Sequence, residues 1–211
     1  MPQNTDALLP IMTGQKVIPV IVLDDAKDAV PLAKALVAGG LPAIEITLRT
    51  DAALDSIRRV AAEVPEAVVG AGTILNAAQF DEAVAAGSKF IVSPGLTPEL
   101  VEAANGSPVP LLPGAVTSSE IMAALEEGYS LLKFFPAEQA GGAAYLKSLS
   151  SPFGGVKFCP TGGVSAKNAP DYLSLPNVLC VGGSWVAPKD AVASGDWDRI
   201  TALAKEAAEA R

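Results

Sequence analysis

Short apolar runs alternate along the chain with segments in which apolar side chains recur at helical spacing. Continuous apolar runs bounded by Gly, Pro, Ser or Asp are typical of parallel strands that are buried on both faces. The eight runs, which we expect to be strands, cover residues 17–23, 43–47, 67–71, 90–93, 109–112, 131–135, 156–160 and 178–181.

Helix start and stop signals lie between these runs. Asp24 or Asp25 can cap a first helix that ends at Gly39-Gly40, and Asn76 can cap a later one. Residues 4–12 have a further helical pattern that precedes the first strand. The chain therefore predicts a regular alternation of strands and helices, with one extra helix at its N-terminal end.

The repeated strand–helix unit indicates the fold class. Eight such units predict an α/β protein, a compact (β/α)8 TIM barrel with roughly 25 residues per unit and the extra N-terminal helix. Because no linker or low-complexity tract divides the chain, we expect residues 1–211 to form a single domain. In the sixth unit Gly141-Gly142 leave room for only a short helix, so a doubly wound open sheet is the alternative. We favour the barrel because it leaves no hydrophobic sheet edge exposed.

The composition limits the classes of function. The formal net charge of −8 argues against binding to nucleic acid or to an anionic membrane, both of which reward surplus Lys and Arg. The chain contains no histidine, which excludes a Ser-His-Asp triad and the usual imidazole ligands of catalytic zinc. Cys159 and Cys180 lie in apolar runs without metal-ligand spacing, so we expect reduced packing residues. A signal-peptide pattern is missing, and we therefore expect a cytoplasmic protein.

Lys133 is the most informative single residue, because it lies inside the apolar run 131–136. Burial disfavours the charged form of a lysine and leaves a neutral amine, which can attack a ketone and form a Schiff base. The alternative is a lysine at the end of its strand that packs its stem on apolar surface and keeps its ammonium group in water.

Glu45, Thr47 and Arg49 alternate along an extended segment and therefore point to one side of it. Polar side chains at the carboxyl ends of barrel strands have a raised chance of being functional, because active sites lie there. Glu45 lies between two isoleucines, which makes it a candidate group for proton transfer. The alternative is a structural ion pair of Glu45 with Arg49 or Lys133.

Small residues and hydroxyl groups follow several other strands. Gly70-Ala71-Gly72-Thr73 removes side-chain volume at the end of the third strand and then supplies a hydroxyl. The segments Gly162-Gly163 and Gly182-Gly183-Ser184 follow the seventh and eighth strands, where barrels often bind phosphate through backbone amides. The sequence therefore predicts a phosphate site between these two glycine loops.

Six motifs that carry these residues occur in one order along the chain. They are Glu45-Ile46-Thr47-Leu48-Arg49, Gly70-Ala71-Gly72-Thr73, Ser93-Pro94-Gly95, Lys133-Phe134-Phe135-Pro136-Ala137-Glu138, Cys159-Pro160-Thr161-Gly162-Gly163 and Gly182-Gly183-Ser184-Trp185. With these motifs the chain resembles the 2-keto-3-deoxy-6-phosphogluconate (KDPG) and 4-hydroxy-2-oxoglutarate (KHG) aldolases, a bacterial class I family with a trimeric barrel fold.

The resemblance implies a role for each candidate residue. Lys133 would form the Schiff base, and Glu45 would transfer protons. The implied substrate contacts are Arg49 and Thr73 for the carboxylate of the keto acid, Pro94, Phe135 and Thr161 for the walls of the pocket, and Gly162, Gly163, Gly182, Gly183 and Ser184 for the phosphate.

The resemblance also implies a reaction and an assembly. The substrate would be a small phosphorylated keto acid, KDPG, cleaved to pyruvate and glyceraldehyde 3-phosphate by a homotrimer without metal or cofactor. KHG would be a second substrate, cleaved to pyruvate and glyoxylate. The two alternatives are a metal-free sugar-phosphate isomerase or epimerase with Glu45 as base, and a noncatalytic phosphosugar-binding barrel in which Lys133 is an anion ligand.

Overall fold

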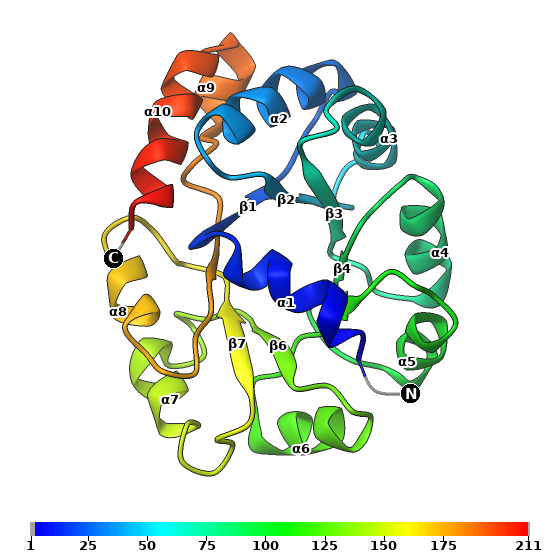
Figure 1. The fold of residues 1–211 in the computed structure, drawn as a ribbon, viewed down its shortest axis with the longest axis vertical. Helices are drawn as coiled ribbons and strands as arrows, with labels where there is room; N and C mark the ends of the chain where they lie inside the picture. Colours follow the sequence, from blue (N-terminus) through cyan, green and yellow to red (C-terminus); the bar gives the residue numbers. More distant parts are fainter. Residues whose placement is uncertain (1–2, 211) are drawn as a thin grey trace.

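The computed structural model describes residues 3–210, so that residues 1, 2 and 211 of the expected domain lie outside the described part. Figure 1 shows strands at the centre of the molecule and helices around them. The strands are Val17–Ile21 (β1), Ala43–Thr47 (β2), Val68–Gly72 (β3), Ile91–Val92 (β4), Leu111–Leu112 (β5), Leu131–Phe134 (β6), Lys157–Pro160 (β7) and Val181–Gly183 (β8). The α/β class that the sequence predicts is therefore confirmed.

Helices alternate with these strands in chain order. Their bounds are Thr5–Thr13 (α1), Ala29–Ala38 (α2), Ala53–Glu63 (α3), Ala77–Ala85 (α4), Pro98–Asn105 (α5), Ser118–Glu126 (α6), Gly142–Ser148 (α7), Ala169–Leu173 (α8), Lys189–Ser194 (α9) and Trp197–Ala208 (α10), with a 3-10 turn at Ala26–Asp28.

All paired strands are parallel, and they form two sheets. The larger sheet has six strands in the order β5-β4-β3-β2-β1-β8, and the smaller one consists of β6 and β7. Single bridges connect the two sheets, from Lys133 of β6 to Gly114 and from Phe158 and Thr161 to the eighth strand segment at Val178 and Gly182. Continuous ladder pairing is thus limited to six plus two strands, rather than the uninterrupted eight-stranded ladder that the sequence suggested.

One strand boundary and one helix cap show how local contacts set the ends of the elements. The eighth strand begins at Val181 rather than at residue 178, because the ladder with β1 starts where Val17 pairs with Val181. Helix α6 is capped by Thr117, whose hydroxyl accepts from the Glu120 amide while the Glu120 carboxylate accepts from the Thr117 amide. This reciprocal pair of bonds satisfies two amide donors at the helix start.

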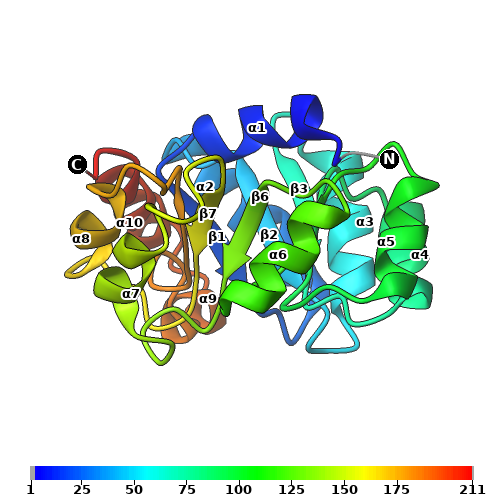
Figure 2. The same cartoon turned by 90° about the horizontal axis from the view of Figure 1, so that it is seen from below.

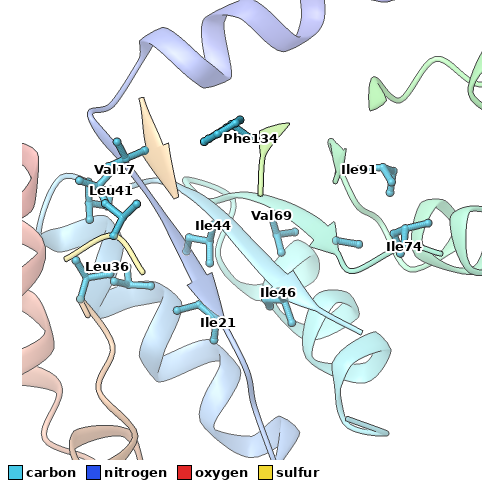
Figure 3. Close-up of a cluster of buried hydrophobic side chains, with 14 of the residues drawn as sticks. Val17, Ile21, Leu36, Leu41, Ile44, Ile46, Val69, Ile74, Ile91 and Phe134 are labelled. Carbon is cyan, nitrogen blue, oxygen red and sulfur yellow. The ribbon is translucent and has the colours of Figure 1, made fainter. Parts of the chain in front are cut away.

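Successive side chains of each strand enter two different apolar clusters. The outer core lies between the strands and the helices and contains Val17, Ile44, Ile46 and Phe134 (Figure 3). The inner core contains the intervening residues of the strands, among them Ile18. Because side chains alternate along a strand, the polar residues that share the inner side are held in fixed positions by the outer core.

Helix α1 closes one end of the inner core. Leu8 and Met12 of this helix are fully buried within the inner core, and Figure 2 shows α1 lying across the ends of the strands. Gln3, just before α1, donates to the carbonyl of Leu111 at 2.8 Å and to the carbonyl of Leu131 at 2.9 Å. The Gln3 side chain therefore connects β5 to β6 at the gap between the two sheets.

The two cysteines lie next to the site-forming strands. Cys159 and Cys180 are free, buried and part of the inner core. A hydrogen bond with Cys159, and then burial, raise the pKa of the Cys180 thiol well above its usual value. In residues 3–210 none of the helices has the length and hydropathy that a membrane crossing requires.

Gln15 provides a test of how the strand ends are stabilised. Its buried side chain donates to the Val17 and Ala43 carbonyls at 2.7 and 2.8 Å and accepts from the Ala43 amide at 2.7 Å. Gln15→Ala leaves these groups unpaired, so we expect the free energy of unfolding to fall by about 2 kcal/mol in urea denaturation. Gln139→Ala, at an exposed position, is the control and should change it by less than about 0.5 kcal/mol. Equal unfolding free energies of the two variants would show that the Gln15 side chain does not stabilise the strand ends.

Candidate active site

Lys133 and Glu45 form a buried ion pair on the inner side of the strands. Lys133 Nζ lies 3.2 Å from Glu45 Oε1, and each side chain is only 4% exposed. Lys133 is the third residue of β6, and its neighbours Leu132 and Phe134 enter the outer core. The amine also lies 5.2 Å from the centre of the Phe135 ring. The sequence alternative of an ion pair between Glu45 and Lys133 is thus present, and it brings the two candidate reacting groups together.

Glycines of β3 make room for the Glu45 carboxylate. Glu45 pairs in register with Gly70. A Cβ on Gly72 would lie 2.0 Å from Glu45 Oε1, whereas a Cβ on Gly70 would lie 2.5 Å from the Phe90 ring. The two glycines therefore serve different purposes: Gly72 leaves space for the carboxylate, and Gly70 allows tight packing of the inner core.

Arg49 and Thr73 meet where β2 and β3 end. Arg49 Nε donates to Thr73 Oγ1 at 3.0 Å, and Arg49 is exposed. Thr73 has a φ of 60°, which is the left-handed region that a β-branched residue rarely adopts. Such strained residues cluster at binding and catalytic sites. The structure thus brings together the two residues to which the family resemblance assigns the substrate carboxylate.

A cavity of about 440 Å³ lies between the glycine loops that follow β7 and β8. Gly162 and Gly163 have φ values of 98° and 75°, which a residue with a side chain would adopt only with strain. A Cβ on Gly182 would lie 2.2 Å from Thr161 Oγ1, so this glycine lets the two strands approach. The sequence-predicted residues that line this cavity are Arg49, Phe135, Thr161, Gly162, Gly163, Gly182, Gly183 and Ser184.

Phe135 connects this cavity to a neighbouring one. The second cavity is also about 440 Å³ and lies beside α5 and α6, with Pro94, Gly114 and Phe135 in its walls. Pro94 is therefore placed apart from the glycine loops, on the other side of Phe135. The ring of Phe135 is a wall shared by both cavities and by the Lys133 amine.

The sequence reasoning missed several residues of the site. Val20, Trp185 and Lys189 line the glycine-loop cavity. Lys189 carries a positive charge near the predicted phosphate site, and its position directly after the eighth strand loop was a usable signal. Trp185 belonged to the motif Gly182-Gly183-Ser184-Trp185 but was assigned no role, and Val20 gave no signal, because apolar residues of a strand and loop are usually packing residues.

Within residues 3–210 no group of three or more Asp, Glu, Cys or His side chains is placed to hold a metal ion. The reactive groups present are an amine, a carboxylate and a guanidinium. A buried lysine beside a carboxylate, next to a cavity with glycine loops, is suited to imine formation with a carbonyl substrate and to proton transfer at the adjacent carbons.

Comparison with known proteins agrees with this arrangement. A family model described as KDPG and KHG aldolase matches residues 9–203. The 2-dehydro-3-deoxy-phosphogluconate aldolase of Pseudoalteromonas atlantica is 56% identical over 191 residues, which cover 90% of this chain and 89% of that protein. The chain therefore belongs to the KDPG and KHG aldolase family.

Two solved structures show the same fold. KDPG aldolase from Legionella pneumophila, with pyruvate captured at low pH as a covalent carbinolamine intermediate, has a TM-score of 0.92 and 46% identity, covering 94% of this chain and 97% of that one. The 2-keto-3-deoxy-6-phosphogluconate aldolase of Zymomonas mobilis ZM4 with 3-phosphoglycerate has a TM-score of 0.92 and 49% identity, covering 98% and 97% of the two chains.

Whether Gly72 provides the space for the Glu45 carboxylate can be tested without an activity assay. Gly72→Ala places a methyl group on the Glu45 carboxylate, and forced overpacking typically costs about 1–3 kcal/mol. We expect that loss of unfolding free energy in urea, together with a displaced Glu45 side chain in a crystal structure of the variant. Gly155→Ala is the matched control, because a Cβ there meets no atom within 4 Å. An unmoved carboxylate in Gly72→Ala would contradict this account.

Proposed function

We propose that this protein is a class I aldolase that cleaves KDPG to pyruvate and glyceraldehyde 3-phosphate, and KHG to pyruvate and glyoxylate. The buried contact of 3.2 Å between Lys133 Nζ and Glu45 Oε1 is the observation that carries the proposal. Membership of the KDPG and KHG aldolase family supports it, as does the covalent pyruvate adduct in the Legionella relative.

Imine formation begins with the neutral amine. Addition to a ketone requires the uncharged amine, and we assign Glu45, whose Oε1 lies 3.2 Å from Lys133 Nζ, as the group that accepts its proton. The amine adds to the C2 ketone of the substrate to give a carbinolamine. Glu45 donates the proton back to the carbinolamine hydroxyl, which leaves as water; this restores the carboxylate and yields a protonated imine, which can accept an electron pair from the adjacent carbon.

Bond cleavage follows when a base removes the proton of the C4 hydroxyl. We assign this step to the Glu45 carboxylate, acting directly or through one water molecule. The C3–C4 bond breaks, its electron pair moves into the imine to form an enamine, and the aldehyde leaves. Protonation at C3 and hydrolysis of the resulting imine then release pyruvate and free Lys133.

The remaining polar groups are assigned to the two charged ends of the substrate. The guanidinium of Arg49 suits a carboxylate, because its planar fork can donate two charge-assisted hydrogen bonds, and Thr73 is already bonded to it. The glycine loops, with Ser184 and Lys189 at the same cavity, suit the phosphate at the opposite end. We assign Pro94, Phe135 and Thr161 to the walls of the substrate site.

The same proposal includes the architecture and setting of the enzyme. We infer a single domain in which the two sheets close into a (β/α)8 barrel, supported by the bridges at Gly114, Val178 and Gly182, with α1 as the extra helix. A homotrimer, a cytoplasmic location and independence of metal or cofactor stay predictions. Solution mass measurement and assay in the presence of a chelator would test the first and the last.

Lys133→Met tests the Schiff base. We expect loss of the borohydride-reduced pyruvate adduct and of nearly all KDPG cleavage, because no other buried amine lies beside Glu45 in residues 3–210. Peptide mass spectrometry locates the adduct in the unaltered protein. Lys34→Met, at an exposed position of α2, is the control and should retain both properties. Normal turnover in Lys133→Met would eliminate imine chemistry and favour the isomerase or sensor alternatives.

Glu45→Gln separates proton transfer from imine formation. The variant keeps the shape of the side chain but lacks its basic oxygen. Burial without a counter-charge favours the uncharged amine, so the adduct with pyruvate should still be trapped by borohydride. Exchange of the pyruvate methyl protons with deuterated water, followed by NMR, should slow by about 10² to 10⁴, the usual contribution of one acid–base group. An unchanged exchange rate would make Glu45 a structural partner of Lys133.

A further inference from the structure

Glu138 connects the loop after β6 to the loop after β7. Its backbone amide donates to the Gly162 carbonyl at 3.1 Å, and the preceding Ala137 amide donates to the Thr161 carbonyl at 2.8 Å. Its side-chain stem covers Gly163, since a Cβ on that glycine would lie 2.6 Å from Glu138 Cγ. One residue therefore fixes both the carbonyl of Gly162 and the path of the chain at Gly163.

Tyr172 holds the carboxylate of Glu138 in this position. The tyrosine hydroxyl, on α8, donates to Glu138 Oε1. Tyr172 is only 1% exposed, so its ring fixes the position of the hydroxyl within the outer core. Burial, and then the Glu138 carboxylate, raise the pKa of Tyr172, which keeps the hydroxyl protonated as a donor. The bond thus ties the β6 loop to the helix that follows the glycine loop.

A third contact fixes the next peptide of the loop. Asn168 Nδ2 donates to the Gly163 carbonyl at 3.1 Å, while its Oδ1 accepts from the Ser165 amide at 2.7 Å. In a trans peptide the carbonyl of one residue and the amide of the next point in opposite directions. With the Gly162 and Gly163 carbonyls bound by Glu138 and Asn168, the amides of Gly163 and Val164 point away from those two residues. Gly163 and Val164 both line the glycine-loop cavity.

We propose that Glu138 and Tyr172 are positioning residues that hold the Gly162-Gly163 loop in the conformation that binds the substrate phosphate. The pair touches neither the Lys133 amine nor the Glu45 carboxylate. It acts on recognition of the phosphorylated end of the substrate and leaves the imine chemistry unaffected. This inference rests on the proposed function, because the ligand of the loop is the phosphate of KDPG.

The test compares a step that needs the phosphate with one that does not. In Tyr172→Phe we expect the KM for KDPG to rise by about tenfold, the loss expected when a charge-assisted hydrogen bond no longer fixes the binding groups, with kcat reduced less than twofold. Deuterium exchange of the pyruvate methyl protons involves no phosphate and should proceed at the parental rate. Tyr129→Phe, a buried tyrosine outside the site, is the matched control and should change neither value.

Variants of Glu138 test the same hydrogen bond from its other partner, and they apply even if Tyr172→Phe folds poorly. Glu138→Ala, at an exposed position, should reproduce the rise in KM, and adding Tyr172→Phe to it should raise KM less than twofold further, because the two residues act through one bond. Glu138→Gln retains an acceptor for the hydroxyl and should stay within about threefold of the parent.

Two results would overturn the inference. One is an unchanged KM for KDPG in both Tyr172→Phe and Glu138→Ala. The other is an equal loss of KDPG cleavage and pyruvate exchange, which would indicate a general loss of structure rather than a disturbed phosphate loop. Failure of the proposed function itself is distinguishable, because the unaltered protein would then not cleave KDPG.

Discussion

The buried contact between Lys133 and Glu45 is the constraint on which the rest of the site depends. Two opposite charges with 4% exposure each are costly to remove from water, and their mutual attraction offsets that cost only at close range. Such a pair persists only if its two strands hold the groups together. Gly72 leaves the space that the carboxylate occupies, and the apolar neighbours of both residues anchor the two strands in the outer core.

The position of this contact depends on the whole fold, because side chains alternate between the two sides of each strand. Side chains on one side of each strand bind the helices to the outer core, and those on the other side either fill the inner core or reach the site. Helix α1 packs against the inner core at one end of the strands. The polar residues gather at the other end, where the strand termini bring Arg49 to Thr73 and to the cavity between the two glycine loops.

Much of this could be predicted from the sequence, and the exceptions have physical reasons. Lys133 and Glu45 are polar residues within apolar strands, a conflict between residue type and surroundings that a pattern can reveal. The role of Gly72 needed the structure, because a sequence cannot tell which glycine faces a carboxylate and which faces Phe90. Glu138 belonged to one of the six motifs but was assigned no role, and its contact with Tyr172 could not be predicted because the two residues come from a loop and a helix that follow different strands. The expected strand boundaries were also too wide where a strand is short: β4 consists only of Ile91–Val92, whereas we expected a strand at residues 90–93.

Phe135 has a consequence for the shape of the site. Its ring borders the amine and lines both cavities, so the two hollows share a wall made by one side chain. A side chain of a different size at this position would therefore change the space available on both sides at once, with the surrounding strands and loops unchanged.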